Sequence, residues 1–407
     1  MRKKKSIIFV IILLILTNLI TFGLTNIIAI RLDDKVIISD RQYRQLVDAY
    51  EENYKVMEVK EYIDSSYLKE VDDKVLMDGQ LKGLVQALED PYSTYFTEDE
   101  FEILTQETSG VYGGIGVIVT PGEDNLITVV SPIEGTPGER AGLRTGDKIT
   151  KVNGVEYFAE NMDEAVAEMK GEPNTTVTLT ILRSDKNNNS HTVDIGITRE
   201  IIRLVTVKSE LLENDIGYLR ITSFDEITYE DFMKELDSLK KSNIKGLILD
   251  LRNNPGGLLN ICADIADEFL GKGDIVYTET RNGEREYLKS DRGMIDIPIV
   301  VLINEGSASA SEILAGAIKD HNRGELIGTT SFGKGVVQRI RDLGDGTGLK
   351  ITVSQYYTPK GTNIHGIGIT PDIVIELNEE AEGIGPEFLE QDNQLQKAIE
   401  VIKAKIL

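Results

Sequence analysis

Between residues 216 and 328, short apolar runs alternate with segments of helical periodicity, and this alternation constrains the fold more than any other feature. We predict strands at residues 216–221, 246–251, 299–303 and 325–328, and helices at 229–241, 258–270 and 309–319. Parallel strands joined by crossover helices form sheets that helices cover, with sites at the carboxyl ends of the strands. The sequence therefore predicts an α/β core of βαβ units around a mostly parallel sheet.

The N-terminus pairs a basic cluster with a long apolar run. Arg2 and three lysines precede the stretch from Ile7 to Ile30, in which Thr and Asn are the polar interruptions. About 20 apolar residues span a bilayer, whereas a cleaved signal peptide has a shorter run and an Ala-x-Ala-like site, which residues 23–26 do not offer. We therefore predict one uncleaved transmembrane helix at the cell membrane, with the lysines in the cytoplasm and everything after Asp33 extracytoplasmic.

The composition argues against several classes of protein. A formal net charge of −24 is unsuited to a nucleic-acid partner, because binding phosphates requires clustered Lys and Arg. A single cysteine, Cys262, cannot form an internal disulfide. Three histidines lie far apart without the spacing of a zinc site, so we expect no metal and no organic cofactor.

At 407 residues the chain exceeds the size that one hydrophobic core supports, so we expect several folded units. The patterning predicts a basic stub and membrane anchor at 1–31, a helical N-terminal region at 32–104, a small β-rich domain at 105–198, the α/β core at 199–380 and a C-terminal helical segment at 381–407. Within the β-rich domain we expect a polar turn around residues 187–189 to join the last two strands.

Three serines stand where a predicted strand passes into a helix: Ser307, Ser309 and Ser311. Backbone N–H groups at a helix N-terminus are unpaired and favour negative charge. A serine there can be a nucleophile whose oxyanion is held by backbone donors. The alternative is structural, because Ser309 and Glu312 also have the spacing of a capping box.

Lys334 is the candidate partner of such a serine. Its apolar neighbours could strip water from the ammonium and lower its pKa, which would let the neutral amine act as a general base. Gln338 follows four residues later and could orient Lys334 or Ser309 by hydrogen bonding. The alternative is an ordinary surface lysine.

The segment around Lys334 also approaches the phosphate-binding pattern G-x-x-x-x-G-K-[ST], through residues 328–335. Gly335 occupies the last position and has no hydroxyl for Mg²⁺, and the residues that follow prefer strand to helix. We therefore set a nucleotide site aside.

A glycine pair follows another predicted strand, in the stretch Asp250 to Gly257. Glycine lets the backbone approach a ligand closely and present its N–H groups. Gly256 or Gly257 could therefore furnish an oxyanion donor beside that of Ala310. A tight turn without a catalytic role is the alternative.

Together these three motifs resemble those of the carboxy-terminal processing peptidases, also called tail-specific proteases. The motifs occur in the same order, with 25 positions from Ser309 to Lys334, and the resemblance extends over residues 40–380. It implies a serine endopeptidase that processes proteins near their C-termini, with Ser309 as nucleophile, Lys334 as general base and Gln338 as its positioning partner. It also implies homodimers built through the N-terminal and C-terminal helical segments.

The same resemblance makes the β-rich unit a PDZ-like domain that controls access to the active site. Gly113, Gly114, Ile115 and Gly116 would form the loop that grips the terminal carboxylate of a protein or peptide substrate, while the substrate adds to the sheet as a strand. The competing hypothesis is a non-catalytic, tethered PDZ scaffold or receptor in which Ser309 is only a helix cap.

Overall fold

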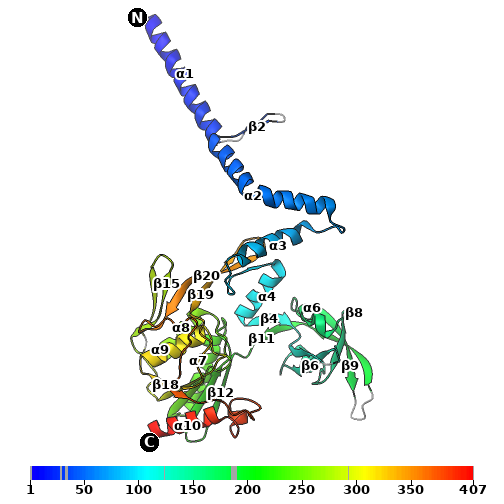
Figure 1. Ribbon diagram of the computed structural model, residues 1–407, viewed down its shortest axis with the longest axis vertical. Coiled ribbons are helices and arrows are strands. Elements are labelled where there is room, and N and C mark those ends of the chain that lie inside the picture. The colour runs from blue at the N-terminus through cyan, green and yellow to red at the C-terminus, as the bar shows by residue number, and fades with distance from the viewer. Residues whose placement is uncertain are drawn as a thin grey trace. The chain divides into compact units, whose positions relative to one another are not determined.

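The computed structural model divides the chain into two compact units, Met1–Leu84 and Val85–Leu407 (Figure 1). It describes residues 2–27, 30–32, 35–122, 124–184, 190–291 and 293–406.

The first unit is mainly helical. It holds α1 (Arg2–Ile27), the hairpin of β1 (Ile30–Leu32) and β2 (Lys35–Ile37), α2 (Asp40–Ser66) and most of α3 (Asp73–Gln86). Within the ranges that the structure describes, no helix combines the length and the apolar character needed to cross a membrane. Residues 28 and 29 of the predicted span lie outside those ranges.

Within the second unit, a small β-rich body follows β3 (Thr94–Phe96) and α4 (Glu98–Ser109), a helix that runs across residue 104. Its antiparallel sheet has the order β10-β9-β7-β6-β5, with β8 paired to β7. The strands are β5 (Val117–Pro121), β6 (Ile127–Pro132), β7 (Lys148–Val152), β8 (Val155–Glu156), β9 (Thr176–Ser184) and β10 (Ser190–Thr198), and the helices are α5 (Pro137–Arg140), η1 (Ala159–Asn161) and α6 (Met162–Met169).

Two short strands flank this body in the sequence. β4 (Val111–Gly114) precedes it and pairs antiparallel with β11 (Glu200–Arg203), which follows it. The polar turn predicted around residues 187–189 lies outside the described residues.

The larger body is built on a six-stranded sheet with the order β12-β13-β14-β17-β18-β21. β12 is antiparallel to β13, and every other neighbouring pair is parallel. The strands are β12 (Val207–Leu212), β13 (Ile216–Ile221), β14 (Gly246–Asp250), β17 (Ile299–Ile303), β18 (Gly324–Gly328) and β21 (Ile373–Val374). Every residue of β14 and β17 is buried, as expected for strands that are covered on both faces.

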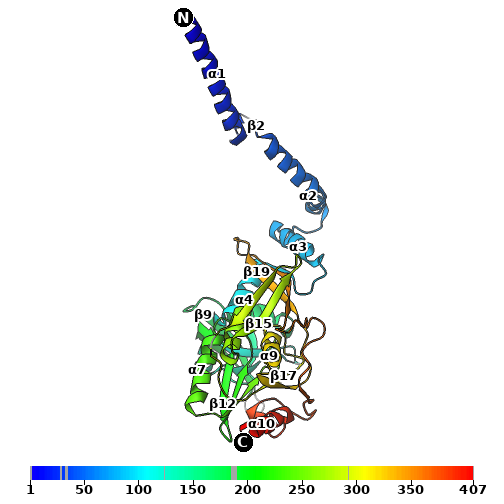
Figure 2. The ribbon, with the colours of Figure 1, turned by 90° about the vertical axis from the view of Figure 1, so that its left-hand side faces the viewer.

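Alternate residues of these strands face two different cores, because side chains along a strand point to opposite faces. Leu247 and Leu249 belong to the core that contains residues of α7 (Thr228–Lys241), α8 (Leu259–Phe269) and α9 (Ala310–Asp320). Ile248, between them, packs with residues of α10 (Asn393–Ile406) in the other core. Figure 2 shows α10 at the lower end of this body, next to the C-terminus. The turn η2 (Pro386–Phe388) precedes α10.

A second, antiparallel sheet was not expected from the sequence. It has the order β16-β15-β20-β19, and β3 adds to β20. The strands are β15 (Gly273–Thr280), β16 (Arg285–Ser290), β19 (Val336–Asp342) and β20 (Gly348–Tyr357). Because β3 pairs with β20, residues near 95 lie beside residues near 349, although they are far apart in the chain.

A fully buried ionic cluster joins α10 to the loop that follows β14. The guanidinium of Arg252 donates to Asp250 at 2.6 Å and to Asp392 at 2.8 Å. It also donates to the amide oxygen of Gln394 at 3.0 Å, while the Tyr218 hydroxyl donates to Asp250 at 2.7 Å. Buried charges require such partners, so this cluster holds the loop of Gly256 and Gly257 against the C-terminal helix.

Candidate active site

Ser309 lies between β17 and α9 in an unusual backbone conformation. Its φ is 53° and its ψ is −113°. An ordinary N-cap serine takes the extended region, and a positive φ in a non-glycine residue costs on the order of 1–3 kcal/mol. The surrounding structure must therefore enforce this conformation, which a simple capping role does not require.

The structure distinguishes the three serines of this segment. Ser307 and Ser311 are fully buried, and their hydroxyls donate to the carbonyl oxygens of Leu251 at 2.8 Å and Asn254 at 2.9 Å. Ser309 lines a cavity at the carboxyl ends of the parallel strands, whose volume is about 350 Å³. Of the three, Ser309 is thus the one whose side chain is placed to meet a ligand.

Glu312 joins the Ser309 segment to the Lys334 segment. Its carboxylate is fully buried and accepts the N–H of Ser309 at 2.8 Å. This is one of the two hydrogen bonds that the predicted capping box contains. The same carboxylate accepts the Ser331 hydroxyl at 2.6 Å and the N–H groups of Gly333 at 2.7 Å and Lys334 at 2.9 Å. One side chain therefore sets the position of both segments.

Lys334 precedes β19 and lines the same cavity as Ser309. Burial lowers the pKa of Lys334, and the charge of Lys350 lowers it further, while Asp90 and Glu312 act in the opposite sense. Its Nζ lies 4.8 Å from the centre of the Tyr92 ring. The structure thus favours the neutral amine more than water does, as a general base requires.

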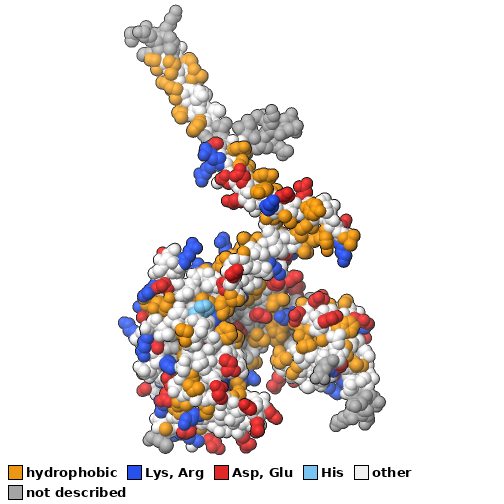
Figure 3. Space-filling model, in the orientation of Figure 1, with side chains coloured by type: hydrophobic (Ala, Val, Ile, Leu, Met, Phe, Trp, Pro, Cys, Tyr) orange, Lys and Arg blue, Asp and Glu red, His pale blue; other side chains and the backbone are white. Residues whose placement is uncertain are grey.

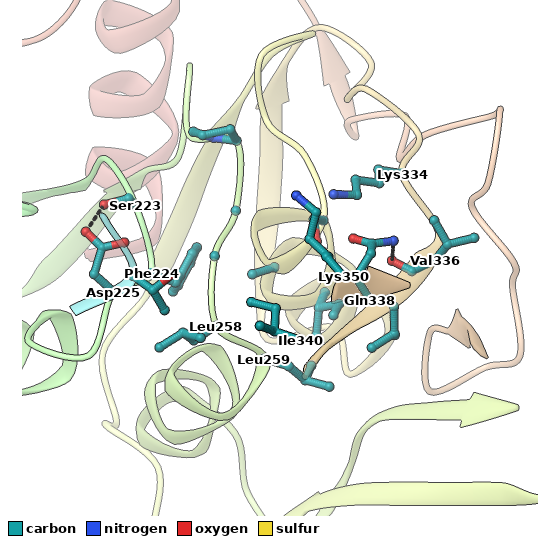
Figure 4. A pocket seen from close by; sticks show the side chains of 18 of the residues that line it. Ser223, Phe224, Asp225, Leu258, Leu259, Lys334, Val336, Gln338, Ile340 and Lys350 are labelled. Atoms are coloured by element: carbon teal, nitrogen blue, oxygen red, sulfur yellow. Dashed lines mark hydrogen bonds between the residues drawn. The ribbon is translucent and has the colours of Figure 1, made fainter. Parts of the chain in front are cut away.

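Gln338 lies in β19 and also lines the cavity. Its amide nitrogen donates to the Val336 carbonyl at 3.4 Å and to the Thr352 hydroxyl at 3.3 Å. Figure 4 shows its amide group beside the side chains of Lys334 and Lys350. The predicted orienting residue is therefore placed near the predicted base.

The two candidate glycines differ in the use of their N–H groups. The N–H of Gly256 donates to the Asn254 side chain at 2.8 Å. Among the described residues, the N–H groups of Gly257 and Ala310 have no acceptor. A Cβ on Gly256 would lie 2.9 Å from that of Ser309 and 3.0 Å from the Ala310 nitrogen, so glycine is needed there for close approach.

All six predicted catalytic and oxyanion residues line this one cavity: Ser309, Lys334, Gln338, Ala310, Gly256 and Gly257. Apolar side chains form another part of its wall, including Leu258 and Leu259, which Figure 4 labels. Among the described residues, no group of three or more His, Cys, Asp or Glu could hold a metal ion.

Four residues at or near this cavity were not predicted from the sequence in the roles that the structure gives them. Glu312 was considered only as a capping residue, and Tyr92 and Lys350 were not singled out. Tyr356, whose hydroxyl donates to the Ser309 carbonyl at 3.1 Å, was also missed. Glu312 alone had a local signal, its spacing from Ser309; the others reach the site from distant parts of the chain.

The predicted carboxylate-binding loop is divided between two environments. Gly113 and Gly114 belong to β4 and pair with β11. Ile115 and Gly116 precede β5, and among the described residues their N–H groups have no acceptor. β5 is the edge strand of its sheet, so it can accept an added strand.

Three stretches of the chain match known protein families. Residues 215–375 match Peptidase family S41, residues 128–183 match the PDZ domain, and residues 15–100 match the N-terminal domain of the activating protease CtpB.

The relatives match over most of the chain. A carboxy-terminal-processing protease of Bartonella bacilliformis is 43% identical over 337 residues, which are 81% of this chain and 76% of the relative. The carboxy-terminal processing protease CtpA of Bacillus subtilis is 37% identical over 382 residues, 93% of this chain and 79% of the relative. The solved structure of a protein described as an S41 protease from Bacteroides fragilis has a TM-score of 0.50 at 17% identity, covers 83% of this chain and 91% of its own, and bears on the fold alone.

The buried carboxylate of Glu312 gives the first prediction. Glu312→Gln replaces one acceptor oxygen by an NH₂ group that faces N–H and O–H donors. We expect the free energy of unfolding to fall by about 2–4 kcal/mol and proteolysis to fall at least about tenfold, because both segments lose their common anchor. Urea denaturation and a peptide-cleavage assay measure the two effects.

Glu305→Gln is the matched control, because its carboxylate accepts the Thr329 hydroxyl at an exposed position. Its effect on unfolding should stay within about 0.5 kcal/mol. A Glu312→Gln protein with the stability and rate of the natural protein would show that the shared anchor is unimportant.

Proposed function

This chain belongs to the carboxy-terminal processing proteases of peptidase family S41, and we propose that it cuts protein substrates near their C-termini with Ser309 as nucleophile and Lys334 as general base. The protein is a serine protease with a PDZ domain. The observation that carries the proposal is the strained Ser309 beside a partly buried Lys334 in one cavity.

The reaction is an acyl transfer in two steps. Neutral Lys334 takes the proton of the Ser309 hydroxyl as Oγ bonds to the peptide carbonyl carbon, and the lysine then gives that proton to the leaving amine. The N–H groups of Ala310 and Gly257 hold the oxyanion, since neither has another acceptor among the described residues. Lys334 then deprotonates a water molecule, which attacks the ester carbon. The bond between that carbon and Oγ breaks, Lys334 returns the proton to Oγ, and the substrate leaves with a free carboxylate.

The PDZ domain binds the substrate's free C-terminus in this proposal and controls its access to the catalytic cavity. The open edge of β5 and the acceptor-free N–H groups of Ile115 and Gly116 support this role. Gly113 and Gly114 then shape the loop from within β4 instead of gripping the carboxylate.

Membrane attachment is a further part of the proposal. The basic cluster before the apolar run supports an N-terminal anchor with the protease on the extracytoplasmic side. The chain should remain with the membrane fraction after an alkaline carbonate wash. Release of the intact chain by that wash would contradict the anchor.

The catalytic pair is tested by Ser309→Ala and Lys334→Ala. We expect each to lower kcat/KM by at least about 10³-fold with little change in melting temperature, since neither hydroxyl nor amine supports the core. Lys334→Arg should be equally inactive, because a guanidinium does not lose its proton. Full activity in Lys334→Ala would contradict the dyad, and unfolding of Ser309→Ala would favour the cap and scaffold hypothesis.

Recognition of the C-terminus is tested with paired peptides that differ only in a free or amidated terminus. Charge-assisted hydrogen bonds are worth about 1.5–3 kcal/mol, so amidation should weaken binding to the Ser309→Ala protein by roughly tenfold or more. Fluorescence anisotropy measures this binding without cleavage. Equal affinities would remove the carboxylate from the recognition step.

A dimer is proposed from the surface of α2. The helix has no buried residue, and its apolar side chains recur every three or four positions, so they share one face (Figure 3). The members of this stripe are about half or more exposed: Tyr43, Leu46, Tyr50, Tyr54 and Met57. A second copy of the same stripe would bury it.

Leu46→Glu should therefore convert the dimer to a monomer in sedimentation analysis, because a carboxylate would be buried in the interface. Gln45→Glu is the matched control, since it adds the same charge on the opposite face of α2. Sedimentation of the natural protein as a monomer, or an equal effect of both changes, would contradict the stripe as interface.

A further inference from the structure

We propose that Lys350 is a positioning residue whose ammonium holds Lys334 in the unprotonated form by like-charge repulsion across the cavity. The inference rests on the proposed role of Lys334 as general base, and it assigns to the site a second lysine that acts through the first.

The strand register places Lys350 at the catalytic cavity. In the antiparallel pair of β19 and β20, Gln338 lies opposite Thr352 and Ile340 lies opposite Lys350. Residues two apart on a strand share a face, so Lys350 projects on the same side as Gln338. Both of them line the cavity that contains Ser309 and Lys334.

The two amines approach each other within this cavity. Figure 4 shows the amine ends of Lys334 and Lys350 turned toward each other, with the amide group of Gln338 beside them. The two charges interact, and this interaction disfavours a proton on Lys334.

Other features of the site would keep Lys334 protonated. Asp90 and Glu312 favour its positive charge, and the Tyr92 ring, with His365 at its edge, offers a face that attracts a cation. Glu107 and Tyr356 also line the cavity. Against these groups stand burial and the charge of Lys350, so removing that charge shifts the balance toward the inactive ammonium.

The surroundings of Lys350 offer its ammonium a ring face and no carboxylate partner among the described residues. Its Nζ lies 5.1 Å from the centre of the Phe96 ring, on β3, whose face favours a positive charge. Among the described residues, Lys350 forms no salt bridge with a carboxylate. Its charge is therefore not neutralised before it acts on Lys334.

The test is the pH dependence of kcat/KM for the full chain with Lys350→Met, Lys350→Arg or Arg341→Gln. The active base is neutral, so the rate rises with pH through the pKa of Lys334. Loss of the Lys350 charge raises that pKa, so Lys350→Met should move the acid limb to higher pH. The rate on that limb should fall severalfold, while the alkaline plateau is kept.

Lys350→Arg keeps the charge and should restore the natural limb. Arg341→Gln removes a charge from the opposite face of β19 and should leave the limb in place. Lys350→Gln serves as a second neutral variant, and thermal unfolding identifies any variant that fails to fold.

An unmoved acid limb in folded Lys350→Met or Lys350→Gln, or an equal loss at every pH, would overturn the inference. A change confined to KM would do the same, because it would make Lys350 a substrate contact. These outcomes differ from failure of the proposed function, which would appear as retained activity in Lys334→Ala.

Discussion

The site depends on one buried carboxylate that two chain segments share. Glu312 lies in the first turn of α9, yet it accepts hydrogen bonds from Ser309 on its own segment and from Ser331, Gly333 and Lys334 on another. Ionised acceptors form stronger and shorter hydrogen bonds than neutral ones. Because a buried carboxylate must be satisfied, the fold cannot separate the serine from the lysine without leaving that charge unpaired.

The strain at Ser309 is understandable against this background. A backbone conformation that costs energy persists only where its neighbours impose it. Glu312 holds the N–H of Ser309, Tyr356 holds its carbonyl oxygen, and Gly256 packs against its Cβ. The Gly256 loop is in turn tied through Arg252 to Gln394 of α10, so a helix at the far end of the core contributes to the geometry of Ser309.

Much of the parallel sheet could be read from the sequence, because each of its central strands is a run of apolar residues bounded by helix signals. The helix predicted at 309–319 is α9, Ala310–Asp320, and the strand predicted at 299–303 is β17. The antiparallel sheet could not be read in the same way, because its strands carry mixed polar and charged residues. The family resemblance placed Gly113 and Gly114 in a loop, whereas they lie in β4. The sequence did not reveal this strand because its partner, β11, lies almost ninety residues further along the chain.

The candidate site was predictable from the sequence where a local motif marks its residues, and not where it depends on residues from distant parts of the chain. Ser309, Lys334 and the glycine pair stand in recognisable motifs, and the structure places them around one cavity. The choice between Gly256 and Gly257 depends on the side chain of Asn254, which only the folded loop brings to the Gly256 N–H. Lys350 lacks any motif, and its relation to Lys334 arises from the register of β19 and β20.

The pairing of β3 with β20 has a practical bearing on any shortened form of the protein. The segment 90–96 supplies the ring beneath Lys334, the ring beneath Lys350 and the Ser93 hydroxyl that accepts the Thr352 N–H. A fragment trimmed to the PDZ and protease matches would start after this segment and would lose the groups that contact Lys334, Lys350 and Thr352. Such a fragment would be a poor surrogate for the enzyme in inhibitor screening or crystallisation.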